Sequence, residues 1–121
     1  LQDRKWEISA YRFNEYESLA PVISLLQANV LQVSDRVGML RPRIDFVRFN
    51  ELSFCIQEQI ASSQDLEKFL SDNPMEMIDQ IGITDVFENL MAMYEDTKEG
   101  RYKPSPLLKT KYLRNQKFIK K

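Results

Sequence analysis

Basic side chains fill the end of the chain. Residues 101–121 contain eight Lys or Arg residues and no Asp or Glu. Such a segment attracts anionic groups, which are phosphates in nucleic acids and membranes and carboxylates in proteins. Large apolar side chains lie between these charges, and they are stabilising only when another surface buries them. We therefore expect this segment to bind a partner through Lys109, Lys111, Tyr112, Arg114 and Lys117.

The residue types that usually perform catalysis are scarce. The chain has no His, which argues against Ser-His-Asp or Cys-His catalysis, most zinc sites and the commonest general base. Its three Gly residues form neither GxGxxG nor GxxxxGK[ST], and no calcium-loop motif is present. The sequence alone therefore predicts no enzyme, no metal and no cofactor.

The one cysteine, Cys55, cannot form an internal disulfide. Its apolar neighbours favour a thiol in the core. Secreted domains of this size usually carry several cysteines, so we expect an intracellular, reducing compartment, with import into an organelle not excluded. No apolar run approaches the length of a transmembrane segment.

Charge is distributed in blocks along the chain. Residues 1–60 are nearly balanced, whereas residues 61–100 contain two basic and ten acidic side chains. Three roles for the basic end remain open: a solvated tail, docking on protein, and binding to nucleic acid or an anionic membrane. We favour docking, either on the acidic block of the same chain, on a second copy or on another subunit.

A long apolar stripe predicts helix in the first third of the chain. Pro21 either kinks this helix or separates two helices. Part of the stripe should meet a partner, through Phe13, Ile23, Leu26 and Val30. Eleven apolar or aromatic residues follow one another at steps of three or four, namely Trp6, Ala10, Phe13, Tyr16, Ala20, Ile23, Leu26, Val30, Val33, Val37 and Leu40.

Later parts of the chain predict further helices. Residues 43–62 have an apolar face opposite polar side chains, which favours a helix. A hairpin turning at Asn50-Glu51 is the alternative, and the absence of glycine disfavours it. Short helices follow in residues 63–97. The expected caps and stops are Ser62 or Ser63, Asn73 with Pro74, Gly82, Thr84, Gly100, and Ser105 with Pro106.

Together these patterns predict an all-α fold, a helical bundle or long helical hairpin with short C-terminal helices and an extended basic tail. Residues 1–100 should form a single helical domain, with long helices in 1–62 and short acidic helices in 63–100, and residues 101–121 the tail. The function predicted from sequence is a non-enzymatic interaction subunit, such as an adaptor, scaffold or assembly factor, that binds a protein partner or forms a homo-oligomer. The alternative is a nucleic-acid-associated protein whose tail contacts phosphates. An enzyme with a carboxylate or lysine centre is the weakest alternative.

Overall fold

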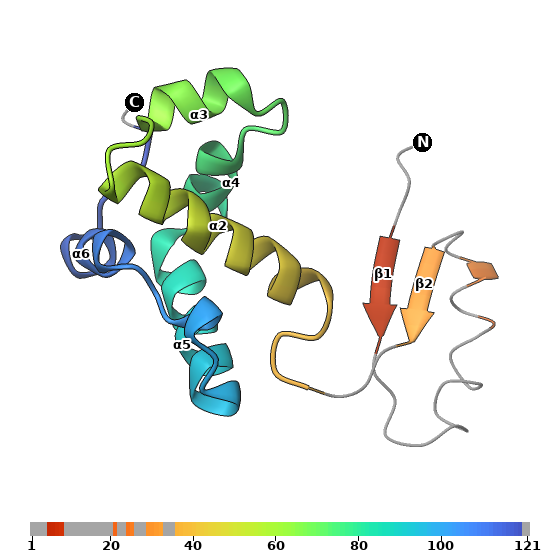
Figure 1. Ribbon diagram of the computed structural model, residues 1–121. Helices are drawn as coiled ribbons and strands as arrows, with labels where there is room; N and C mark the ends of the chain where they lie inside the picture. Colours follow the sequence, from red (N-terminus) through yellow and green to blue (C-terminus); the bar gives the residue numbers. More distant parts are fainter. Residues whose placement is uncertain (1–4, 9–20, 22–23, 26–28, 33–35, 120–121) are drawn as a thin grey trace. The chain divides into compact units, whose positions relative to one another are not determined.

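The computed structural model describes residues 5–8, 21, 24–25, 29–32 and 36–119. Contacts divide the chain into two units, residues 1–42 and 43–121, and each is described by itself (Figure 1). The division by contacts falls after Pro42, and the division predicted after Gly100 stays a prediction.

The first unit contains a pair of parallel strands, β1 (Lys5–Ile8) and β2 (Asn29–Gln32). Trp6 lies opposite Val30 in the register. The expectation of helix along the whole apolar stripe is therefore wrong at these two stretches. Short apolar runs fit a strand as well as a helix, and spacing alone does not separate the two.

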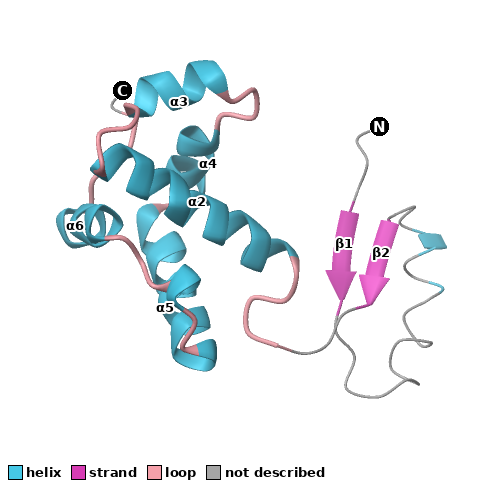
Figure 2. Ribbon diagram, in the orientation of Figure 1, coloured by secondary structure: helices cyan, strands magenta, loops and turns pink. Residues whose placement is uncertain are grey.

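The second unit is helical, which confirms the predicted all-α class (Figure 2). The helix expected in residues 43–62 is present, and the alternative hairpin at Asn50-Glu51 is absent from this described stretch. The elements of this unit are α2 (Arg41–Gln57), α3 (Ser63–Phe69), α4 (Pro74–Ile81), α5 (Ile83–Thr97), the short 3₁₀ helix η1 (Gly100–Tyr102) and α6 (Pro106–Arg114).

One apolar core joins these helices. Phe49 of α2, Ile78 of α4, Leu90 of α5 and Leu108 of α6 are almost completely buried. Burial of side chains this size supplies most of the driving force for packing the short helices together. The other buried hydrophobic residues of the core are Phe46, Leu66, Met75, Ile83, Val86, Met93, Tyr102 and Phe118.

Two predicted helix caps are present. The Ser62 hydroxyl accepts from the Asp65 N–H at 3.1 Å, and the Asp65 carboxylate accepts from the Ser62 N–H, which completes a capping box at α3. The Ser105 hydroxyl accepts from the Leu108 N–H at 3.0 Å and caps α6. Both caps satisfy N–H groups that have no partner inside their helix.

The predicted N-cap at Asn73 is confirmed in position but not in its side-chain bond, and the predicted cap at Thr84 is wrong. Asn73 occupies the N-cap position of α4 in a left-handed conformation (φ 49°), and its side chain makes no capping bond. Instead the Glu67 carboxylate on α3 accepts from the Met75 N–H at 2.8 Å. Thr84 lies inside α5, because that helix already begins at Ile83.

Gly82 is the whole connection between two helices. It is the C-cap of α4 and the N-cap of α5, with φ 102°. A Cβ at this position would meet no atom within 4 Å, so the constraint is on the backbone and not on space. Only glycine adopts this conformation without strain, as the predicted stop at Gly82 anticipated.

An ion pair between α2 and the turn before α4 should make stability depend on pH. The Arg48 guanidinium donates to Asp72, with 2.9 Å between Nη2 and Oδ1, and lowers the pKa of the Asp72 carboxyl. The pair therefore stabilises the fold fully above the ordinary carboxyl pKa of 3.8, and this contribution is lost as the pH falls below that value through the lowered pKa. We expect the free energy of unfolding of Arg48→Met to fall less between pH 6 and pH 3 than that of the wild type, measured by urea unfolding. Arg114→Met, at an exposed position, is the control and should leave the pH dependence unchanged.

Candidate functional site: the docked C-terminal arm

The basic end of the chain folds back onto the helices. We call residues 100–119 the C-terminal arm; it consists of η1, α6 and a strap of residues 115–119 (blue in Figure 1). Part of the tail expected to be extended is thus helical, as the predicted cap at Ser105 and Pro106 implied. Tyr102, Leu108 and Phe118 of the arm belong to the core.

Asn50 of α2 holds the start of the arm. Its side-chain amide donates to the carbonyl oxygens of Arg101 at 3.2 Å and Lys103 at 2.8 Å. Its carbonyl oxygen accepts from the Ser105 N–H at 2.8 Å. Asn50 is only 1% exposed, so a single buried amide satisfies three backbone groups of the arm.

Two serines extend this contact toward α6. The hydroxyl oxygens of Ser53 and Ser105 lie 2.6 Å apart, and Ser53 also donates to the Asn50 carbonyl. One helical turn further along α2, the Gln57 side chain accepts from the Leu107 N–H at 2.8 Å. Since α2 presents these polar side chains at steps of three and four, they share one face and follow the arm along the helix.

Aromatic rings join α6 to α5. The Tyr112 ring stacks on Phe87, with 4.0 Å between centroids and 14° between planes. The Tyr112 hydroxyl lies 3.4 Å from the Glu88 carboxylate and donates to it. Tyr112, predicted to bind a partner, therefore contacts α5 of its own chain.

Asp79 of α4 holds the strap. Its two carboxylate oxygens accept from the N–H groups of Phe118 at 2.7 Å and Ile119 at 2.8 Å. The Phe118 ring is 5% exposed. The Lys111 ammonium lies 5.0 Å from the centroid of that ring and donates to the Lys117 carbonyl at 3.1 Å. A carboxylate that accepts two backbone N–H groups is a strong anchor for an otherwise short segment.

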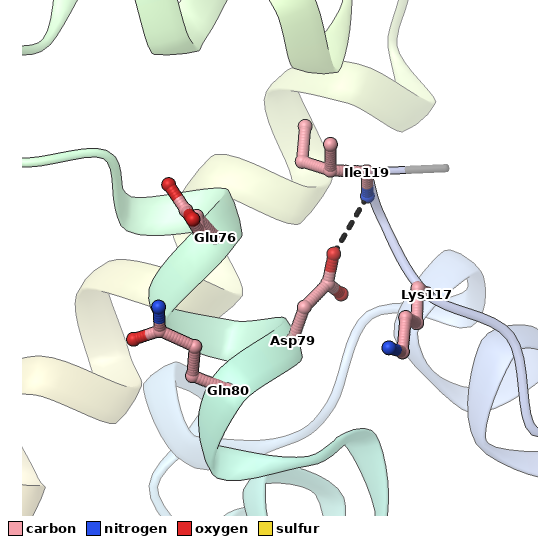
Figure 3. Close-up of a pocket in the computed structure, with 5 residues that line it drawn as sticks. All are labelled: Glu76, Asp79, Gln80, Lys117 and Ile119. Carbon is pink, nitrogen blue, oxygen red and sulfur yellow. Dashed lines mark hydrogen bonds between the residues drawn. The ribbon is translucent and has the colours of Figure 1, made fainter. Parts of the chain in front are cut away.

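A hollow of about 210 Å³ lies between α4 and the strap. Figure 3 shows Asp79 pointing from α4 toward the backbone of Ile119, with Lys117 on the strap side. Glu76 and Gln80 complete the lining. Asp79 is committed to the strap, and the described residues hold no group of His, Cys, Asp and Glu suited to a metal ion. The hollow is therefore a small polar recess beside the strap.

The residues predicted from sequence to bind a partner stay a prediction, and the structure describes only some of them. Lys109, Arg114 and Lys117 are exposed, and among the residues that the structure describes none of the three forms an ion pair. Val30 lies in β2 and its side chain is not described. Phe13, Ile23 and Leu26 lie outside the described residues.

In the part of the chain that the structure describes, the arm docks through buried apolar side chains and through hydrogen bonds from its backbone to Asn50 and to the Asp79 carboxylate. Sequence reasoning missed Asn50, Ser53 and Asp79, which make most of the polar contacts with it. A signal was present in α2, where Asn50, Ser53 and Gln57 interrupt an otherwise apolar face at helical spacing.

Comparison with protein families decides what kind of chain this is. Residues 38–121 match the family model of the 3-hydroxyacyl-CoA dehydrogenase C-terminal domain. This stretch includes all five described α-helices and the C-terminal arm. The chain belongs to the 3-hydroxyacyl-CoA dehydrogenase C-terminal domain family.

Solved dehydrogenase structures share the fold. FadB2 of M. tuberculosis is 17% identical with a TM-score of 0.83, and the match covers 95% of this chain and 46% of FadB2. 3-Hydroxybutyryl-CoA dehydrogenase of Escherichia coli K12 is 26% identical with a TM-score of 0.74, and the match covers 90% of this chain and 25% of that dehydrogenase. (S)-3-hydroxybutyryl-CoA dehydrogenase PaaH1 of Ralstonia eutropha is 19% identical with a TM-score of 0.78, and the match covers 89% of this chain and 41% of PaaH1. The chain thus spans less than half the length of each, and no curated protein sequence matches it.

Membership of this dehydrogenase family overturns the function predicted from sequence. The expectation of a non-enzymatic adaptor, scaffold or assembly factor is wrong, and so is the nucleic-acid alternative. The lack of histidine and of a glycine-rich loop concerns only the residues of this chain. It does not exclude that the chain is one domain of an enzyme whose other residues carry the chemistry. No described helix is long and apolar enough to cross a membrane.

Proposed function

We propose that this chain supplies the helical C-terminal domain of a dehydrogenase acting on 3-hydroxyacyl-CoA thioesters. Such an enzyme oxidises the 3-hydroxyl group of its substrate to a ketone and passes a hydride to a nicotinamide cofactor. The observation that carries the proposal is the family match over residues 38–121. The 26% identity with the Escherichia coli 3-hydroxybutyryl-CoA dehydrogenase, over 90% of the chain, supports it.

The residues of this chain do not fit a nicotinamide dinucleotide. The sequence contains no GxGxxG loop to approach a pyrophosphate. The described part of the first unit holds two parallel strands of four residues each. We therefore assign no hydride-transfer step to groups of this chain.

The parallel strands support a role within a larger enzyme. Parallel sheets are normally covered on both faces and contain more than two strands, because a short pair is too weak to persist alone. Leu31 in β2 remains 52% exposed. We propose that further strands and helices of the complete enzyme extend and cover β1 and β2.

The helical unit would then act as a fixed support. Asn50 and Asp79 hold the arm at its two ends, so α2, α4 and α6 are held together. A rigid domain of this kind can form one wall of a substrate cleft. The half-buried, unpaired thiol of Cys55 supports the further proposal that the protein works in a reducing compartment.

An activity assay tests the proposed function. The full-length product of the reading frame that encodes this chain should oxidise (S)-3-hydroxybutyryl-CoA, or a longer 3-hydroxyacyl-CoA, with reduction of a nicotinamide cofactor. The 121-residue chain alone should show no activity, because it lacks a dinucleotide-binding loop. A folded full-length product that is inactive with short, medium and long acyl chains would contradict the proposal. Asp85→Asn, an exposed and conservative change, is the control variant and should retain activity.

A further inference from the structure

The strap is bound to the helices in the way a short peptide is bound to a protein. The backbone N–H groups of Phe118 and Ile119 donate to the Asp79 carboxylate at 2.7 Å and 2.8 Å. The Phe118 ring belongs to the apolar core, and the Lys111 ammonium lies 5.0 Å from its centroid. We call Asp79, Lys111 and the apolar site filled by the Phe118 ring the strap seat. The seat contacts only a non-helical backbone and one aromatic ring.

The strap can leave the seat without moving α6. Asn115 is the C-cap of α6 in a left-handed conformation (φ 50°), and the two residues after it are exposed. The contacts that hold α6 precede this residue, with Leu108 in the core and Tyr112 stacked on Phe87. Rotation of the backbone after Asn115 therefore releases the strap alone. Segments held by so few contacts open at a lower free energy than the whole fold.

The seat is also accessible from one side. Asp79 and Ile119 line the hollow of about 210 Å³ between α4 and the strap, together with Glu76, Gln80 and Lys117 (Figure 3). An incoming segment therefore has a route to the Asp79 carboxylate that does not require the helices to separate.

We propose that the strap seat is a binding site for a segment of a partner protein, and that the strap is its internal competitor. The strap itself indicates the chemistry of the ligand: an aromatic residue followed by an aliphatic one, in a non-helical backbone whose two N–H groups are free to donate. The carboxylate recognises the backbone, and the apolar site selects the ring. A short tether holds the strap near the seat at an effective concentration of about 1 mM, so the partner has to displace it. This inference does not depend on the proposed enzymatic activity.

Peptide binding to a vacated seat tests the proposal. The probe is a fluorescent peptide with the sequence of residues 114–119, blocked at both ends. The host is the full chain with Phe118→Pro, which removes the ring and one N–H group from the strap and leaves the seat intact. Fluorescence anisotropy should show saturable binding to this host. The wild-type chain should bind the same peptide at least about tenfold more weakly, because its own strap occupies the seat.

Substitutions on both sides identify the contacts. Phe118→Ala in the peptide should weaken binding to the vacated host by about tenfold or more, because the ring is lost. Ile119→Pro in the peptide, which removes one N–H group, and Asp79→Ala in the host, which removes the acceptor, should have effects of similar size. Glu51→Gln in the host removes an exposed carboxylate of α2 and is the control, which should leave the affinity unchanged.

Hydrogen exchange on the wild-type chain tests the same competition without a substitution. Excess peptide should accelerate exchange at the Phe118 and Ile119 amides, because it traps the open strap, and should leave the amides of α5 unchanged. Circular dichroism checks that each variant is folded. The absence of both saturable binding to the folded Phe118→Pro chain and faster exchange in the wild type would overturn the proposal. Binding that survives Asp79→Ala and the peptide change Phe118→Ala would overturn it too, because the peptide would then bind elsewhere.

Discussion

Replacing Asn50 with leucine is expected to lower the free energy of unfolding by about 3 kcal/mol. The substitution removes the only hydrogen-bonding groups that the structure shows for the carbonyl oxygens of Arg101 and Lys103, and it leaves the Ser105 N–H without its acceptor. The buried Ser105 N–H would cost the fold its full desolvation penalty, and the two carbonyl groups, which are part-buried, would each cost less. Urea unfolding monitored by circular dichroism measures the change.

A matched control separates the loss of the Asn50 hydrogen bonds to the arm from the effect of removing any asparagine side chain. Asn89→Ala removes an exposed side chain that donates to the Asp85 carbonyl within the same helix, and should cost less than about 0.5 kcal/mol. If Asn50→Leu and Asn89→Ala were equally mild, the arm would be held mainly by its apolar residues, and the assigned role of Asn50 would be wrong.

Asp79→Ala is expected to release the strap at a cost of about 2 kcal/mol, because both acceptors for the N–H groups of Phe118 and Ile119 are removed. The substitution should lower the stability of the whole fold and also increase local opening of the strap. Hydrogen exchange at these two amides should accelerate far more than at the amides of α5.

The conservative variants refine this prediction. Asp79→Asn keeps one acceptor oxygen and should lie between the wild type and alanine in both stability and exchange rate. Glu51→Gln, on the exposed side of α2, is the control for loss of a carboxylate and should change neither. Unchanged exchange at Phe118 in Asp79→Ala would show that the buried ring alone holds the strap.

Local chemistry predicted much of the helical unit. Ser62, Gly82 and Ser105 were recognised because a cap or a stop depends on the residue itself and on its immediate neighbours. Asn73 was recognised as the N-cap residue, but its missing side-chain bond was not, because Glu67 on the preceding helix accepts the Met75 N–H instead. A contact between elements carries no signal in either segment alone.

The strands were missed for a related reason. Trp6 and Val30 fit a helical stripe by spacing, and they fit β1 and β2 by residue type. Pairing between two stretches this far apart in sequence decides which pattern applies. The spacing of apolar residues within one stretch does not contain that information.

The apolar residues of the basic end were a better guide to its docking than its charge was. Buried rings, neutral hydrogen bonds and the Asp79 carboxylate hold the arm in place. Lys109 and Arg114 remain at the surface. The enzymatic family could not be deduced from residue types, because a helical domain can serve a dehydrogenase without carrying its cofactor loop.

The one-residue connection at Gly82 restricts the positions at which this domain can gain or lose residues. Successive helical residues are rotated by about 100°, so one residue added within the first turn of α5 would turn Val86, Leu90 and Met93 away from the core. A deletion would remove the residue that both ends α4 and begins α5. The segment between α2 and α3, residues 58–62, is mostly exposed and could absorb such changes. Insertions and deletions among relatives should therefore collect there, while the spacing from Pro74 to Thr97 stays constant.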